Sequence, residues 1–198
     1  MGGEESFPDG PPVAPDSEDG FQIKMGPFFL APGGSLNDEL EFFQKYALDL
    51  PEDTEVIRMD TRISGASHHF LAYSYDSPEA ANNIQPGLRL NSFHNNVTLV
   101  EAVQGTSDIV LPEGSAFKWE KDIVLDLNSH YINYSLNLPY KAEVYWNIYT
   151  QEAGMAAQEM KTELIPNLSI VIPNNEEHIS LGQNISGSGG DIQFIFGL

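Results

Sequence analysis

Cysteine is absent from the 198-residue sequence, and long hydrophobic runs are missing as well. Without cysteine the chain forms no disulfide, thiolate zinc site or iron–sulfur cluster, so any metal must be held by histidine, carboxylate, carbonyl or methionine. The apolar stretches are far too short to cross a bilayer, and we expect no transmembrane segment. Phosphate-binding loops, serine-nucleophile elbows and zinc-protease motifs are also missing from the sequence.

Basic residues are scarce, because nine Lys and Arg stand against 29 Asp and Glu, which gives a formal net charge of −20. Such a surface repels phosphate, so we expect neither nucleic acid nor an anionic membrane as a partner. A cation is a natural partner for this charge. The acidity could equally serve solubility alone, so charge by itself does not establish metal binding.

The first 20 residues differ in composition from the rest, with six acids, no Lys or Arg, and clusters of Gly, Pro and Ser. They have few side chains to bury, and we predict a flexible acidic tether. Two interpretations stay open. One is the spacer of an exported protein, periplasmic or extracellular, with a lipid anchor at its native N-terminus. The other is a tail with no anchor.

From Phe21 onward the sequence predicts an all-β protein. Short segments rich in Val, Ile, Phe, Tyr and Thr alternate with Gly, Pro, Asn and Asp, and no helical period competes with them. This pattern is typical of an antiparallel β-sandwich or jelly roll. The predicted strands are residues 21–30, 39–47, 55–63, 69–75, 97–103, 123–134, 142–150, 159–164, 169–172 and 191–196.

Three of the five histidines fall at predicted strands: the adjacent His68 and His69, and the separate His130. Imidazole is a common ligand of copper and zinc, but neighbouring residues on a regular strand point to opposite faces. His68 and His69 can share one ion only if their strand begins irregularly, which Gly65 and Ser67 favour. From spacing alone, a three-histidine metal site and three ordinary structural histidines both remain open.

The remaining histidines and two of the methionines are weaker candidates for metal ligands. Met155 and Met160 could bind Cu(I) through sulfur, but core packing is the better interpretation of both. His94 and His178 lie among Asn and Glu residues, and we expect them in solvent-facing loops.

Five segments carry a resemblance to a known family: 65–71 (GASHHFL), 109–117 (IVLPEGSAF), 123–131 (IVLDLNSHY), 144–149 (VYWNIY) and 153–155 (AGM). In this order they resemble the N-terminal copper domain of the ascorbate-dependent copper type II monooxygenases. That family includes peptidylglycine α-hydroxylating monooxygenase and dopamine β-monooxygenase. The first segment is similar to its His-His-Met/Phe ligand strand, the second to its leucine-proline-x-glycine loop, and the third to its strand ending in His-Tyr.

The resemblance implies that His68, His69 and His130 hold the single copper of an electron-relaying domain. In the family, hydroxylation occurs at a second copper, held in a second domain by a His-x-His motif and a Met. This sequence has no His-x-His motif and ends at Leu198, in a segment similar to the strand before that motif. We therefore expect a catalytic copper domain beyond Leu198 and no hydroxylation by this chain alone. A natural single-domain relative remains the alternative.

We divide the chain into the tether at 1–20, a copper-binding domain at 21–165, and a last part at 166–198. That last part holds either closing strands or the start of a second domain. Three functions stay open: the electron-transfer half of a copper monooxygenase, a non-catalytic copper-binding module at the cell surface, and a structural or carbohydrate-binding sandwich. For the third, Tyr145 and Tyr149 would share one face of a strand and Trp146 the other.

Overall fold

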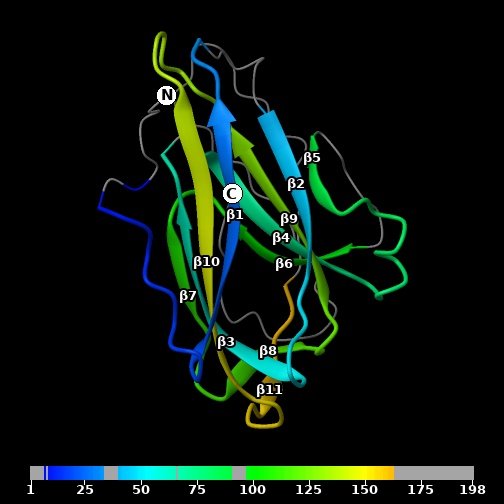
Figure 1. Ribbon diagram of the computed structural model, residues 1–198. Helices are drawn as coiled ribbons and strands as arrows, with labels where there is room; N and C mark the ends of the chain where they lie inside the picture. Colours follow the sequence, from blue (N-terminus) through cyan, green and yellow to red (C-terminus); the bar gives the residue numbers. More distant parts are fainter. Residues whose placement is uncertain (1–6, 8, 34–39, 66, 91–96, 163–198) are drawn as a thin grey trace, which may run out of the picture.

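Strands and the turns between them account for the regular structure of the chain. The computed structural model describes residues 7, 9–33, 40–65, 67–90 and 97–162. These residues form 11 strands in two sheets packed face to face, and none of them is helical (Figure 1). The predicted antiparallel β-sandwich is confirmed. No helix of membrane-spanning length and hydrophobicity occurs in the described part of the chain.

The first sheet has six strands, in the order β1-β10-β3-β8-β11, and β7 also pairs with β3. All of its pairings are antiparallel except the short one between β8 and β11. The strands are β1 (Gly20–Leu30), β3 (Thr54–Ile63), β7 (Ser107–Val110), β8 (Ser115–Trp119), β10 (Tyr140–Glu152) and β11 (Gln158–Glu159).

The second sheet has five strands, all antiparallel, in the order β5-β2-β9-β4-β6. Strand β9 is therefore the central strand, with β2 on one side and β4 on the other. The strands are β2 (Leu40–Ala47), β4 (Ser67–Tyr75), β5 (Gly87–Leu90), β6 (Val97–Val103) and β9 (Val124–Tyr131).

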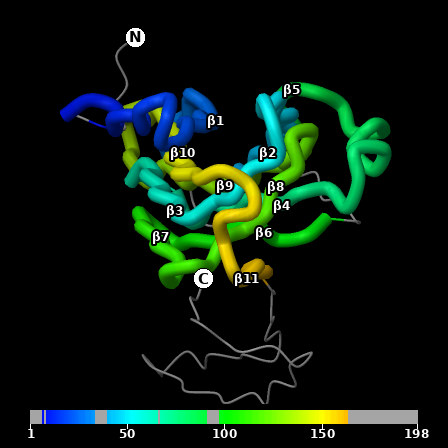
Figure 2. Tube along the Cα trace, turned by 90° about the horizontal axis from the view of Figure 1, so that it is seen from below, coloured from blue at the N-terminus to red at the C-terminus, as the bar shows by residue number. Residues whose placement is uncertain are grey.

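The core lies between the two sheets, which Figure 2 shows end-on. Alternation along each strand sends apolar side chains inward, so that Leu125 and Leu127 of β9 are fully buried. Trp146 of β10 packs in the same core from the other sheet, and its ring and the Phe70 ring are in a T-shaped arrangement at a centroid distance of 5.6 Å. Burial of this set of large apolar side chains is the main driving force for the fold.

Most predicted strands agree with the structure, and the differences have local causes. The sequence missed β5, β7 and β8, which have four or five residues each and show no long alternation. The strand predicted at 123–134 ends at Tyr131. Of the predicted strand at 159–164, residues 159–162 are described, and among these only residue 159 belongs to a strand. Segments 169–172 and 191–196 lie outside the described residues. Met160 packs against the core as predicted, but the prediction for Met155 was wrong, because its side chain is largely exposed.

The described part of residues 1–20 runs along the first sheet. Asn147 donates a hydrogen bond to the carbonyl of Val13 at 3.0 Å, and the Phe7 ring lies edge-on to Tyr145 at 5.3 Å. Gly20 is already the first residue of β1. The mobility of the tether stays a prediction.

Candidate metal site

A β-bulge places the adjacent histidines together. The β4–β9 ladder shifts register between Ser67 and Phe70, so that His68 and His69 of β4 stand opposite the single residue His130 of β9. In a regular strand the two neighbours would point to opposite faces. The extra residue of a bulge bends the strand and redirects its side chains. The irregular strand start predicted from the sequence is therefore present.

The bulge is held by short-range contacts at the start of β4. The amide of Ser67 donates to the carbonyl of Ser64 at 2.9 Å, which closes a tight turn around Gly65. The Ser67 hydroxyl donates to the carbonyl of His69 at 3.3 Å. Phe70 follows at once and is fully buried, so regular inward packing resumes immediately after the histidines. The local backbone is thus fixed on both sides of the pair.

His130 lies on the outer face of the central strand. Alternation along β9 sends Leu127 and Tyr131 into the core, which leaves Asn128 and His130 on the opposite side. His130 is the next-to-last residue of the strand. It therefore sits close to one end of the sandwich.

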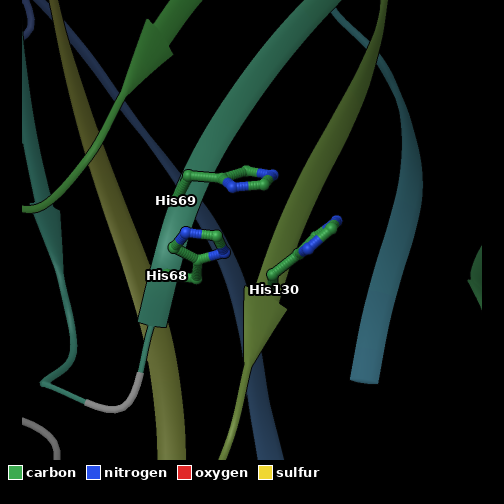
Figure 3. A group of neighbouring side chains, drawn as sticks. All are labelled: His68, His69 and His130. Atoms are coloured by element: carbon green, nitrogen blue, oxygen red, sulfur yellow. The ribbon is translucent and has the colours of Figure 1, made fainter. Parts of the chain in front are cut away.

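The three imidazoles converge (Figure 3). Ring centroids are 4.9 Å apart for His68 and His69, 4.0 Å for His69 and His130, and 6.3 Å for His68 and His130. One ligand nitrogen of each ring lies within 4.8 Å of the other two. His68 is exposed and the other two are half-buried, so the cluster can be reached from solvent. The structure thus brings together the three residues singled out in the sequence.

A carboxylate on the neighbouring strand contacts the cluster from one side. Glu41 of β2 is directly opposite His130 in the β2–β9 ladder, and its Oε1 atom contacts His130 Nε2. The side-chain amide of Asn128 donates to the same Oε1 at 3.2 Å and to the carbonyl of Phe42 at 3.2 Å. Glu41 is therefore held by β9 as well as by β2.

The same outer face continues into a buried polar network away from the histidines. Nη2 of Arg89 donates to both carboxylate oxygens of Asp126, at 2.6 and 2.7 Å, and the Tyr75 hydroxyl donates to the same carboxylate at 3.1 Å. Tyr73 lies between the two regions. Burial raises its pKa, and the negative charges of Glu41 and Asp126 raise it further. Glu41 and Asp126 thus place negative charge on this face, and Arg89 offsets the charge of Asp126.

The cluster fits a metal ion by its donors and its spacing. Nitrogens that share an ion at about 2 Å each lie about 3 to 4 Å apart, so small side-chain rotations suffice to close the site. Among the described residues this is the one group of three or more His, Asp or Glu side chains with ligand atoms so close. Three imidazoles without sulfur suit copper or zinc and leave a coordination position for another ligand.

Sequence reasoning found the histidines but missed Glu41 and Asn128. Both are ordinary polar residues in alternating strands, and nothing in their local pattern distinguishes them. Only the register of β2 against β9, which puts Glu41 opposite His130, reveals their role. The remaining two histidines, His94 and His178, and any domain that follows Leu198 lie outside the described residues.

Comparison with known proteins does not add a family. No protein-family model and no curated protein matches this chain. The resemblance to the copper monooxygenases therefore stays a prediction drawn from the sequence motifs.

Proposed function

We propose that this β-sandwich binds one copper ion through His68, His69 and His130. The observation that carries the proposal is the bulge that gathers two adjacent histidines opposite a third one, at a solvent-accessible end of the sheet. The order of affinities for divalent ions favours Cu(II) over Zn(II) at such a site. The strongly acidic chain adds a long-range attraction for any cation.

We further propose that the bound copper takes part in electron relay, as the sequence motifs imply. Copper supplies one-electron exchange between Cu(I) and Cu(II) when it is bound. The chain contributes a scaffold in which β4 and β9 fix the imidazoles from two hydrogen-bonded strands of one sheet, so little rearrangement accompanies a change of charge. Hydroxylation would require the second copper domain expected beyond Leu198.

A copper-storing module is the second candidate, and the exposure of His68 favours it, because an open site can exchange its ion. The third interpretation has less support. Trp146 is fully buried, Tyr145 is nearly so, and Arg58 lies over the Tyr149 ring at 4.5 Å, so these three aromatic residues form no open platform for a sugar ring.

Metal titration tests the proposal. We expect the wild-type chain to bind one Cu(II) per molecule, more tightly than Zn(II), with nitrogen hyperfine structure in the electron spin resonance spectrum. Replacing His130 with Ala should weaken copper binding by at least about 100-fold, since it removes one of the three ligands and the only one that β9 supplies. The variant His178→Ala is the matched control and should bind as the wild type does. Equal affinity of His130→Ala and wild type would reject the site.

A redox titration separates relay from storage. Ascorbate should reduce the bound Cu(II), and air should restore the signal without loss of metal, if the domain relays electrons. Release of the ion on reduction, or a signal that ascorbate leaves unchanged, would favour the storing module instead.

A further inference from the structure

The carboxylate of Glu41 contacts His130, one of the three histidines of the cluster. It faces His130 across the β2–β9 pair, and a quarter of its side chain is exposed. Its oxygens do not belong to the group of atoms that lie within 4.8 Å of one another, although carboxylates qualify for such a group. Glu41 therefore reaches His130 but not the point where the three rings converge.

The hydrogen-bond pattern fixes which atom carries the proton. Oε1 of Glu41 already accepts a hydrogen from the Asn128 amide, and a carboxylate oxygen accepts but does not donate. The hydrogen in the contact with His130 then belongs to Nε2 of the imidazole. A neutral imidazole has one N–H, so its lone pair is on Nδ1. In Figure 3 the outer nitrogen of the His130 ring accordingly points away from β4.

We infer that Glu41, supported by Asn128, is the positioning residue that makes His130 bind its metal through Nδ1; this rests on the proposed copper site. Metal-bound histidines commonly donate their second N–H to a carboxylate, which fixes the tautomer and the ring orientation and makes the ligand more basic. Here the partner is built into the sheet. Glu41 reaches the ring from β2, while Asn128 holds its carboxylate from the strand that also carries His130.

Copper titration of Glu41 variants is the first test. Replacing Glu41 with Ala should weaken Cu(II) binding by about 10- to 100-fold, the usual cost of losing such a partner. Glu41→Gln keeps an acceptor oxygen without the charge, and its Cu(II) affinity should fall between those of the wild type and Glu41→Ala. The control is Glu113→Ala, which removes the same charge from an exposed turn, and it should bind as the wild type does. Thermal unfolding of the metal-free variants should confirm that all three are folded.

The second test reads the ligating nitrogen directly. The protein with nitrogen-15 histidine is loaded with cadmium-113, and the one-bond coupling between the two nuclei identifies the bound atom of each ring. We expect the coupling at Nδ1 of His130 in the wild type, and a mixture of Nδ1 and Nε2, or no bound His130, in Glu41→Ala. A change in the bound nitrogen is not expected from a merely structural role of Glu41.

The outcomes separate this inference from the proposed function. Coupling at Nε2 of His130 in the wild type, or wild-type copper affinity in Glu41→Ala, would overturn the inference and leave the three-histidine site standing. Equal weakening by Glu41→Ala and Glu113→Ala would also overturn it, because general charge would then be the cause. A wild-type chain that binds no copper would overturn both.

Discussion

The two faces of the five-stranded sheet differ in the polar side chains that they carry. The inner face is apolar, with Phe70, Leu125 and Leu127 fully buried. It also holds the carboxyl of Glu101, to whose two oxygens the Thr61 hydroxyl donates at 2.9 and 3.0 Å. The outer face carries several charged and imidazole side chains. Polar groups on the inner face must be neutral and bonded, while those on the outer face can be charged because water or counter-charges lie beside them.

The outer face itself has two ends. At the β5 end, Arg89 and Asp126 are nearly inaccessible and paired with each other. At the other end His68 is exposed, and the carboxylate of Glu41 contacts His130. The buried ion pair at the first end is suited to stabilising the fold. The accessible histidines at the second end are suited to binding a ligand. This comparison leads to three predictions, ordered by the size of the expected effect.

The largest expected effect is a pH dependence of the free energy of unfolding that comes from Glu101 on the inner face. Burial raises the pKa of Glu101 to about 8, although the hydrogen bond from Thr61 acts in the opposite direction and the nearby Asp60 raises it further. In the unfolded chain this carboxyl has its ordinary pKa of about 4.5. The contribution of Glu101 to the free energy of unfolding is thus fully present below about pH 4.5, falls as pH rises, and is lost above about pH 8. It amounts to as much as about 5 kcal/mol.

Glu101→Gln isolates this contribution, because glutamine is neutral at every pH and keeps the shape. Urea unfolding of wild type and variant at about pH 5 and about pH 8 gives the difference in stability at each pH. The wild type should lose stability relative to Glu101→Gln as the pH rises. A difference that does not change with pH, or one that changes in the opposite sense, would show that Glu101 is not held protonated in the core.

The second-largest effect is a loss of stability when the ion pair at the buried end of the outer face is broken. Asp126→Ala removes the partner of Arg89 and an acceptor of the Tyr75 hydroxyl. Leaving one member of a buried ion pair uncompensated costs about 3 to 5 kcal/mol, so chemical denaturation should show a loss of this size. Asp76→Ala is the control, because Asp76 contacts Thr98 at an exposed position and its loss should cost little. The copper affinity of Asp126→Ala should stay close to that of the wild type. A clear loss of affinity would show that the two ends of the face are coupled.

The fold followed from the sequence to a large extent, because the long strands alternate and the turns are marked by Gly, Pro and Asn. Strand β10 shows this best: its alternation predicts Trp146 and Tyr145 on opposite faces, and in the structure Trp146 is the one in the core. The short strands β5 and β7 could not be found in this way. They are edge pairings with half-exposed side chains, and their strand geometry comes from the neighbours β2 and β3.

The site followed from the sequence only in part. The histidine pair needed an irregular strand start, and the flexible Gly65 and polar Ser67 indicated one. The alignment of the bulge opposite His130 depends on long-range register, which no local pattern specifies. Glu41 was missed for the same reason. Copper as the metal and the role in electron relay stay predictions from the sequence motifs.

The smallest change in stability should come from the open end of the outer face. His130→Ala removes a half-buried ring and its contact with Glu41, and the metal-free variant should unfold within about 1 kcal/mol of the wild type, as surface changes usually do. Leu127→Ala, three residues earlier on the inner face, is the matched control and should cost about 2 to 5 kcal/mol. Copper at 100 times its dissociation constant should then add about 2.7 kcal/mol to the wild type. The same copper should add at most about 0.4 kcal/mol to His130→Ala if its affinity is 100-fold lower. A large loss of stability in metal-free His130→Ala would instead make His130 a structural residue, and the difference between the two faces would disappear.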